Sequence, residues 1–338
     1  MSMPNLRGAI FGCGMIAEYH LRGWLRIPEV EIVALGDIAL EHAEARRTQF
    51  IPTARIYDNL PTLLAAERLD FIDILTPPAF HRAHCLQARK AGLHIICQKP
   101  LCDELEEARA LVAETATYPK IFAVHENHRY RPWFQRILQL HCAGFFGAVQ
   151  FVRFEHLNPT APNEAYKLTS ERGVWLEYGT HLVDMMRALL GEPQRVTARL
   201  HHLNPAVRGE SLAHAAYEYE QATAVIEVAW KALGALQAGV LVTGTAGEAY
   251  FEGTLTRGRA SRLRLYQAGS LVLDEACSPD EDYVESFYAF ERECTNAMLG
   301  RGAVTQTGAE HLQTLHSTFA AYAAATGQPM TLPPLSAV

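Results

Sequence analysis

Residues 7–17 read Arg-Gly-Ala-Ile-Phe-Gly-Cys-Gly-Met-Ile-Ala, an apolar run that ends in a Gly-x-Gly-x-x-Ala turn. The order predicts a strand, a tight turn and a helix, the arrangement that holds a dinucleotide pyrophosphate at a helix N-terminus. Gly12 suits the tight turn, Gly14 lets the backbone approach the phosphates, and Ala17 lets the helix pack on the strand. A lone motif of this kind also occurs by chance, so the flanking pattern has to support it.

The second apolar run, residues 31–36, ends in Asp37. Counted from the glycine turn, that is about 20 residues further on, where a carboxylate accepts hydrogen bonds from the adenosine ribose hydroxyls. Ile38 and Ala39 follow it and offer no cation to a ribose 2′-phosphate, and Arg46 and Arg47 lie a helix length away. The sequence therefore predicts NAD as the cofactor, with NADP less favoured.

The composition limits the class of protein. The chain has 338 residues, is 49% hydrophobic, and carries a formal net charge of −7. This length suffices for two domains with separate cores, and the absence of a basic run argues against nucleic acid or anionic membranes as partners. The first residues show no apolar stretch typical of a signal peptide, no run approaches membrane length, and the seven cysteines form no Cys-x-x-Cys pair. We therefore expect a cytoplasmic protein with reduced thiols and no metal site.

The first ~130 residues alternate apolar strands with amphipathic helices, which predicts an α/β domain with a doubly wound parallel sheet. After the first strand we expect strands at 31–37, 55–57, 71–77, 94–98 and 120–125, and helices at 15–26, 39–49, 61–67 and 79–91. A further helix should open at Asp103, an N-cap candidate with Glu106 three residues later. We place a dinucleotide-binding domain at residues 1–126.

Residues 127–338 should form an α+β domain for substrate binding and oligomerisation. After a helix at 132–142, the pattern changes to the period-two alternation of a mainly antiparallel, open-faced sheet. Strands are expected at 148–156, 195–202, 236–243, 248–252, 262–267 and 270–274, a hairpin at 213–230, and helices at about 282–299 and 308–326. Val225, Ile226, Val228 and Trp230 suggest that a second subunit covers part of the open face, as in a homodimer or homotetramer.

Three segments contain residues that could take part in catalysis or ligand binding. Lys99 follows the strand at 94–98, at the sheet edge where open α/β folds bind ligands, although such a lysine is also a common surface charge. Glu177, His181 and Asp184 would lie on one face of a helix, inside an apolar stretch. Three interpretations are open for this face: an exposed polar stripe, a set of metal ligands, or the lining of a cleft. Residues 125–133 are dense in hydrogen-bonding groups where one domain passes to the next, which suits a linker or an interdomain ligand site.

Together these segments resemble the glucose-fructose oxidoreductase, inositol dehydrogenase and MocA (Gfo/Idh/MocA) family of NAD(P)-dependent oxidoreductases, over nearly the whole chain. The resemblance is carried by the opening glycine motif, Asp37, Thr76-Pro77-Pro78-x-x-His81, Lys99-Pro100, Asn127-x-Arg129-Tyr130, Gly179-x-His181-x-x-Asp184 and the stretch 242–247. It implies a Rossmann domain and a dehydrogenase that moves a hydride between nicotinamide and a secondary alcohol of a sugar, polyol, cyclitol or sugar acid.

The resemblance also implies roles for single residues. His181 would be the general base, Lys99 would stabilise the developing alkoxide, and Glu177 would orient the substrate or the other two groups. The implied cofactor-binding residues are Gly12, Gly14, Met15, Ile16, Ala17, Asp37, Ile38, Thr76, Pro77, His81, Gln98, Lys99 and Asn127. The implied substrate-binding residues are Lys99, Arg129, Tyr130, Tyr166, Trp175, Glu177, His181 and Asp184.

Two positions depart from the family pattern, because Gln98 stands where relatives usually carry Glu and Glu177 where they usually carry Asp. Relatives often hold the bond before the proline in cis, so a cis Lys99-Pro100 bond is expected. Two alternatives stay open: a redox-neutral, cofactor-recycling enzyme of the same family, and a non-catalytic dinucleotide-sensing regulator on the same fold.

Overall fold

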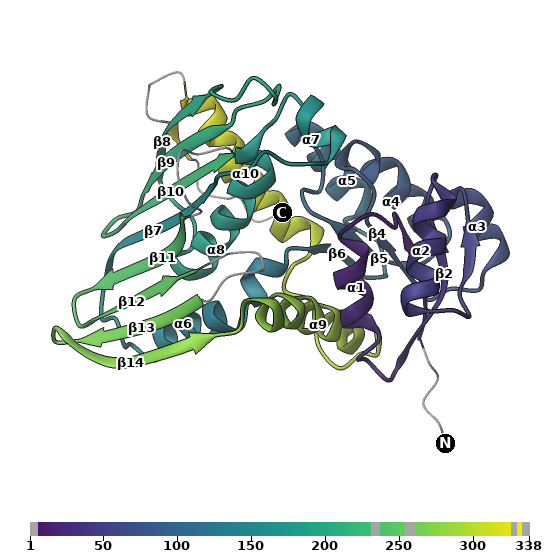
Figure 1. Ribbon diagram of the computed structural model, residues 1–338, viewed down its shortest axis with the longest axis horizontal. Helices are drawn as coiled ribbons and strands as arrows, with labels where there is room; N and C mark the ends of the chain where they lie inside the picture. The colour runs from purple at the N-terminus through teal and green to yellow at the C-terminus, as the bar shows by residue number, and fades with distance from the viewer. Residues whose placement is uncertain (1–5, 231–236, 254–260, 326–329, 333–338) are drawn as a thin grey trace. The chain divides into compact units, whose positions relative to one another are not determined.

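The computed structural model describes residues 6–230, 237–253, 261–325 and 330–332 (Figure 1). The chain divides into two compact units. The first comprises Met1–Asn127 and Val284–Leu312, and the second comprises His128–Tyr283 and Gln313–Val338. The predicted boundary lay between residues 126 and 127, one residue before this first break. The return of 284–312 to the first unit was not predicted, because an amphipathic helix pattern does not show which core the helix packs on.

The first unit is built on six parallel strands in the order β3-β2-β1-β4-β5-β6. The strands are β1 (Leu6–Phe11), β2 (Val30–Gly36), β3 (Arg55–Tyr57), β4 (Phe71–Ile74), β5 (His94–Gln98) and β6 (Phe122–His125). The helices between them are α1 (Ala17–Trp24), α2 (Leu40–Phe50), α3 (Leu60–Ala66), η1 (Pro78–Phe80), α4 (His81–Lys90) and α5 (Leu105–Thr115). This strand order is that of a doubly wound fold, so the predicted architecture is confirmed.

The central strands form because most of their residues are apolar, on both faces, as a parallel sheet covered on both sides requires. All four residues of β4 are buried, and so are the last four residues of β1 and of β5. One local prediction was wrong. Asp103 does not cap α5, because the helix begins at Leu105 and Glu104 occupies the N-cap position in an extended conformation, without a side-chain cap hydrogen bond.

The second unit is built on nine strands in the order β14-β13-β12-β11-β7-β10-β9-β8-β15. The strands are β7 (Val149–Asn158), β8 (Arg195–His201), β9 (Leu212–Glu218), β10 (Thr223–Trp230), β11 (Gln237–Gly244), β12 (Gly247–Glu252), β13 (Ser261–Gln267), β14 (Ser270–Cys277) and β15 (Met330–Thr331). Among these pairings only β7 with β10 is parallel. The sheet is therefore mainly antiparallel, as predicted.

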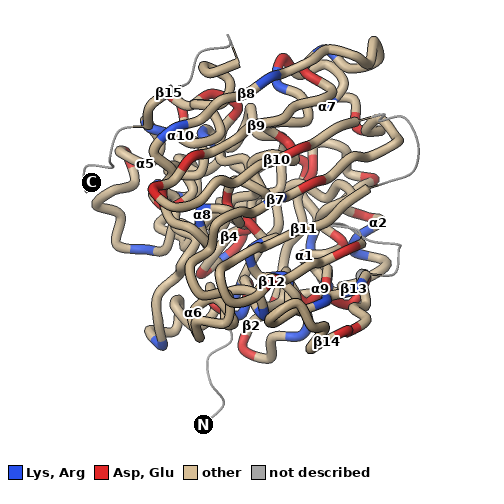
Figure 2. The backbone as a smooth tube through the Cα atoms, turned by 90° about the vertical axis from the view of Figure 1, so that its left-hand side faces the viewer, with Lys and Arg blue, Asp and Glu red and all other residues tan. Residues whose placement is uncertain are grey.

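The remaining helical segments are η2 (Asn127–Tyr130), α6 (Pro132–Cys142), α7 (Ala165–Thr169), η3 (Trp175–Gly179), α8 (Thr180–Leu190), α9 (Pro279–Met298) and α10 (Gly308–Ala324). The apolar faces of α6, α8 and the second half of α10 share one hydrophobic core with the nine-stranded sheet. Figure 1 shows α6 and α8 on the same side of that sheet. No described helix of the unit covers the opposite face of the sheet. Figure 2 shows this face, with acidic and basic residues distributed along its strands.

The apolar residues predicted to lie on this open face mostly do not. Ile226, Val228 and Trp230 are 0%, 0% and 3% exposed and pack into the core, whereas Val225 alternates to the other side. The prediction was wrong because neighbouring strand residues point to opposite faces, so Val225 and Ile226 cannot share one. Of the described helices, none is long and apolar enough to cross a membrane. All seven cysteines are free thiols.

Candidate active site

The glycine turn after β1 has the backbone that a pyrophosphate site needs. Gly12 has φ +103°, and a Cβ at this position would lie 2.6 Å from the carbonyl carbon of Leu75, so only glycine fits. A Cβ at Gly14 would meet no protein atom within 4 Å. The space beside Gly14 is thus open, and its backbone is accessible to a ligand. Met15 and Ile16 continue the turn into Ala17, the first residue of α1.

Asp37 lies directly after β2, beside this turn. Its two carboxylate oxygens accept hydrogen bonds from the backbone N–H groups of Cys13 (2.7 Å) and Ala39 (2.9 Å). A carboxylate has about four acceptor positions, so two remain for ribose hydroxyls. Ile38 is 86% exposed and follows it at the surface. The residues present therefore fit an adenosine ribose.

Arg46 is closer to the turn than the sequence suggested. Its guanidinium donates to the carbonyl oxygen of Gly14 from Nη2 (3.1 Å) and Nε (3.3 Å), and Nη1 lies 3.7 Å from a carboxylate oxygen of Glu18. The expectation that Arg46 lies a helix length away was wrong, because α2 folds back beside the turn. The guanidinium of Arg46 is therefore bound to groups of the protein, the carbonyl oxygen of Gly14 and the carboxylate of Glu18.

Thr76, Pro77 and His81 form the next loop, after β4. The ring of His81 is wholly buried, with Nε2 2.6 Å from the carbonyl oxygen of Thr76 and Nδ1 3.0 Å from that of Pro100. Burial lowers the pKa of His81 to about 4, against the effect of these carbonyls. His81 thus joins the loop after β4 to the loop after β5. Its ring is engaged within the protein, and the contact of His81 with the cofactor stays a prediction.

Lys99 and Asn127 are the last two predicted cofactor-binding residues of the first unit. Lys99 is half-buried after β5, and the Lys99-Pro100 bond is cis, as expected. Gln98 accepts a hydrogen bond from the backbone N–H of Lys99. The side chain of Asn127 donates to the hydroxyl of Ser286 on α9 (2.9 Å). The glycine turn, Asp37, Thr76 and Lys99 therefore all lie at the carboxyl edge of one sheet.

In the second unit, the segment that carries Glu177 and His181 is not a plain α-helix. Trp175–Gly179 form η3, a single turn of π-helix that runs directly into α8. A π-turn inserts an extra residue, so the predicted simple α-helical spacing of Glu177 and His181 was wrong. Such turns occur often at functional sites, where they re-aim side chains.

His181 is 5% exposed and lies against a second histidine. The rings of His181 and His128 have centroids 3.8 Å apart and planes inclined by 30°. The ring of Tyr178 has its centroid 6.2 Å from that of His181 and stacks on His156 at 4.2 Å. His128 was not predicted as a site residue, although it lies inside the hydrogen-bonding segment 125–133.

Glu177 is paired with a residue that the sequence analysis missed. The ammonium of Lys167 lies 2.9 Å from an oxygen of Glu177 and 3.2 Å from an oxygen of Glu164. These carboxylates hold the pKa of Lys167 well above its ordinary value, although burial acts in the opposite direction. Tyr166, which is 40% exposed, precedes it on α7. Lys167 lies ten residues before Glu177 in the sequence, and no motif links the two positions, so the pair could not be predicted.

Three residues expected to bind substrate are engaged elsewhere. Trp175 is wholly buried and donates from Nε1 to the carbonyl oxygen of Thr318 (3.0 Å), so it is a core residue. Arg129 donates two hydrogen bonds to the buried carboxylate of Asp184, at 2.7 and 2.8 Å. The charged groups of Arg129 and Asp184 thus pair with each other, and their role as substrate ligands stays a prediction. Tyr130 is 9% exposed.

Glu210 fixes the chain entering η3. One of its oxygens accepts hydrogen bonds from the backbone N–H groups of Gly173 and Trp175, both at 2.9 Å, and from the hydroxyl of Tyr322 at 2.8 Å. A Cβ on Gly173 would lie 1.9 Å from the carbonyl oxygen of Glu210, so this contact requires glycine. The turn before Glu177 is therefore held by a buried acid.

Three groups of the first unit have the chemistry of a metal site. His20, His125 and Glu291 are wholly buried, and one ligand atom of each lies within 4.8 Å of the others. However, Nδ1 of His20 lies 2.7 Å from Asp73 and its Nε2 lies 3.0 Å from Gln98. Both ring nitrogens of His20 are thus held by Asp73 and Gln98, which leaves neither of them available to a metal in this arrangement.

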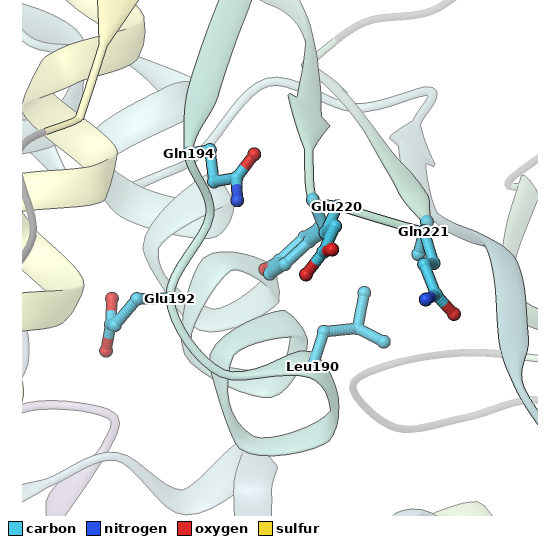
Figure 3. A pocket seen from close by; sticks show the side chains of 7 residues that line it. Leu190, Glu192, Gln194, Glu220 and Gln221 are labelled. Carbon is cyan, nitrogen blue, oxygen red and sulfur yellow. The ribbon is translucent and has the colours of Figure 1, made fainter.

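A surface pocket of about 340 Å³ lies at the C-terminal end of α8, opposite the end that carries His181 (Figure 3). It is lined by Leu190, Glu192, Gln194, Tyr219, Glu220, Gln221 and Ala222. None of the predicted site residues lines it. Glu192 in this wall is bound by the guanidinium of Arg187 at 2.9 Å. The pocket is therefore distinct from the predicted catalytic residues of the second unit.

His156 gives a prediction about stability. Burial lowers its pKa to about 4, whereas an unfolded histidine titrates near 6.5. Between these values the unfolded chain binds the extra proton, so stability is lost as the pH falls through this window, by about 3 kcal/mol for this ring. We expect His156→Phe, which keeps an aromatic ring against Tyr178, to flatten the fall in melting temperature below about pH 6.5.

Thermal melts across this pH range check the prediction, with His202→Phe at an exposed position as the control. An unchanged pH dependence in the His156→Phe protein would contradict it.

Comparison with known proteins gives a consistent result for both units. A family model described as "Oxidoreductase family, NAD-binding Rossmann fold" matches residues 6–126, and one described as "GFO/IDH/MocA C-terminal domain" matches 134–250. D-apiose dehydrogenase of Paraburkholderia graminis is 30% identical over 336 residues, covering 96% of this chain and 88% of the relative. D-apiose dehydrogenase of Rhizobium rhizogenes is 28% identical over 342 residues, covering 96% of each chain.

Among solved structures, an oxidoreductase from Agrobacterium radiobacter in complex with NAD+, L-tartaric acid and magnesium is similar over 97% of this chain and 98% of its own. The TM-score is 0.87 and the identity is 25%. The similarity therefore extends through both units, including the strands and helices that carry the candidate residues.

Proposed function

The chain belongs to the Gfo/Idh/MocA family of oxidoreductases, and from this premise we propose that Lys99, His181 and Glu177 carry out its alcohol oxidation. The protein is an NAD-dependent oxidoreductase that acts on CH–OH groups of sugars or polyols. The observation that supports the proposal best is the common sheet edge of the first unit. It carries the glycine turn, Asp37 and Lys99 at the ends of β1, β2 and β5.

The bound nicotinamide supplies the hydride acceptor, so the protein has to supply placement and proton transfer. The ammonium of Lys99 donates a hydrogen bond to the substrate hydroxyl oxygen and stabilises its developing negative charge. A ring nitrogen of His181 accepts the hydroxyl proton, because a neutral imidazole is a base near neutral pH. Glu177, in its pair with Lys167, accepts hydrogen bonds from a neighbouring hydroxyl of the substrate and sets its orientation.

The test is NADH production by the purified protein. D-Apiose is the first substrate to assay, because two relatives that match over nearly the whole chain are D-apiose dehydrogenases. A panel of aldoses, inositols, polyols and sugar acids follows, each with NAD and with NADP. Stoichiometric NADH release supports a simple dehydrogenase. Substrate conversion without NADH release would instead identify a cofactor-recycling reaction.

Asp37 should determine cofactor affinity and leave chemistry unchanged. Replacing Asp37 by Ala removes the ribose acceptor, and hydrogen bonds to a charged group contribute about 1.5–3 kcal/mol each. We expect NAD binding to weaken about tenfold to a hundredfold, with little change in kcat at saturating NAD.

Titration of NADH fluorescence measures the effect, with Glu41→Ala, an exposed acid on α2 four residues after Asp37, as the control. A higher kcat/KM with NADP than with NAD in the parent protein would contradict the assignment of Asp37.

We also propose that the second unit mediates self-association through its nine-stranded sheet. The open face carries Arg153, Glu155, Val225 and Glu227, so this interface would be more polar than a subunit core. Light scattering at micromolar concentration should give a dimer or tetramer. A strictly monomeric mass would count against this interface.

A further inference from the structure

Gln98 links the candidate catalytic lysine to a buried polar cluster of the first unit. Its Oε1 accepts a hydrogen bond from the backbone N–H of Lys99 at 2.7 Å, and its Nε2 lies 3.0 Å from Nε2 of His20 on α1. Gln98 is 8% exposed, and His20 is wholly buried. The end of β5 is therefore tied to α1 through one side chain.

The donor and acceptor chemistry of these contacts fixes the tautomer of His20. A backbone N–H only donates, so the oxygen of Gln98 faces Lys99 and its NH₂ group faces His20. The Nε2 atom of His20 must accept and carries no proton. The ring proton is therefore on Nδ1, which donates to Asp73 over 2.7 Å. The same oxygen of Asp73 accepts a hydrogen bond from Nε1 of Trp24 at 2.8 Å.

Two further groups face this imidazole. An oxygen of Glu291, on α9, lies 3.7 Å from Nδ1 of His20, and the ring of His125, on β6, lies with its centroid 4.1 Å from that of His20. Burial and the charge of Asp73 raise the pKa of Glu291 well above its ordinary value. A carboxylate at position 98 would be a third acid facing the ring of His20, after Asp73 and Glu291. The amide of Gln98 adds no further negative charge there.

We infer that Gln98 is a positioning residue for Lys99, anchored in turn by His20 in its neutral Nδ1–H tautomer. The inference rests on the proposed role of Lys99 at the reacting oxygen. The amide fixes the direction in which the backbone leaves β5, and hence the point from which the ammonium of Lys99 reaches the substrate. His20 and Asp73 hold the amide without contacting the substrate, and misplacement of a catalytic group by about 1 Å can lower a rate by about a hundredfold.

The tautomer is tested directly in the resting protein. Side-chain ¹⁵N spectra of histidine-labelled protein, with the His20 signals assigned from a His20→Gln sample, should show a protonated Nδ1 and a bare Nε2 at neutral pH. In Gln98→Glu, Nε2 of His20 must donate to the new carboxylate, so both nitrogens should be protonated. A native His20 with a protonated Nε2, in either charge state, would overturn the inference.

Kinetics separate positioning from simple structural support. Gln98→Met should lower kcat about tenfold and change the Kd of NAD less than about twofold, because the N–H of Lys99 loses its partner. Gln98→Glu keeps that hydrogen bond and should restore most of kcat. Trp24→Phe, which removes a donor from Asp73 and leaves the link between Gln98 and Lys99 intact, should keep kcat within about twofold.

Equal losses in Gln98→Met and Trp24→Phe, or no loss in Gln98→Met, would overturn the inference. If no substrate yields NADH, the proposed function fails, but the ¹⁵N spectra still decide the state of His20.

Discussion

Replacing His181 by Asn should lower kcat by about a hundredfold or more, which is the usual loss when acid–base assistance is removed. The ring lies against His128 and beside Tyr178, and asparagine leaves a polar side chain in that place. The Kd of NAD should stay close to the parent value, because His181 is assigned to the reacting oxygen and not to the pyrophosphate or ribose. Lys99→Met should behave in the same way. Steady-state kinetics and NADH fluorescence together measure both quantities.

The pH profile provides an independent check on this assignment. Oxidation by the parent enzyme should become faster as the pH rises, because the base has to be unprotonated to accept the hydroxyl proton. His202→Asn, at an exposed position, is the matched control and should match the parent. If His181→Asn kept the parent rate and the parent pH profile, the assignment would be wrong and Lys99 would be the leading candidate for the base.

The first unit was predictable because its signals are local. The strand β1, the Gly12 turn and Asp37 follow one another within a single stretch of sequence, and each constrains the backbone by itself. Parallel strands end at one edge, so Lys99 could be placed near the turn from its position after β5 alone. The prediction of an N-cap at Asp103 was wrong because an acid three residues before a glutamate locates the start of a helix only to within a residue or two.

The candidate site was less predictable because its contacts join distant parts of the sequence. His20 meets Asp73, 53 residues further on, and no periodicity distinguishes a buried histidine of α1 from an exposed one. The π-turn at Trp175–Gly179, which begins at the buried Trp175, could not be inferred from apolar spacing. Arg129 and Asp184 were both recognised as unusual, but only the structure shows that each is the partner of the other.

That pair should contribute more to stability than any surface ion pair of the second unit. Arg129 donates two hydrogen bonds to Asp184, which is wholly buried and also accepts from the hydroxyl of Thr314 at 2.9 Å. Removal of one partner leaves a buried charge without compensation, which costs about 3–5 kcal/mol. Arg129→Met and Asp184→Leu should each lower the free energy of unfolding by about this amount, as measured by urea denaturation.

The double variant distinguishes an uncompensated charge from lost packing. Arg129→Met with Asp184→Leu removes both charges, so its loss should be far smaller than the sum of the single losses. Arg195→Met is the control, because Arg195 and Glu218 form a half-exposed pair at 3.6 Å whose loss should cost less than about 1 kcal/mol. Additive losses in the double variant would show that Arg129 and Asp184 act through packing alone. A strong coupling would mean that this pair holds α8, the helix that also carries His181, against η2.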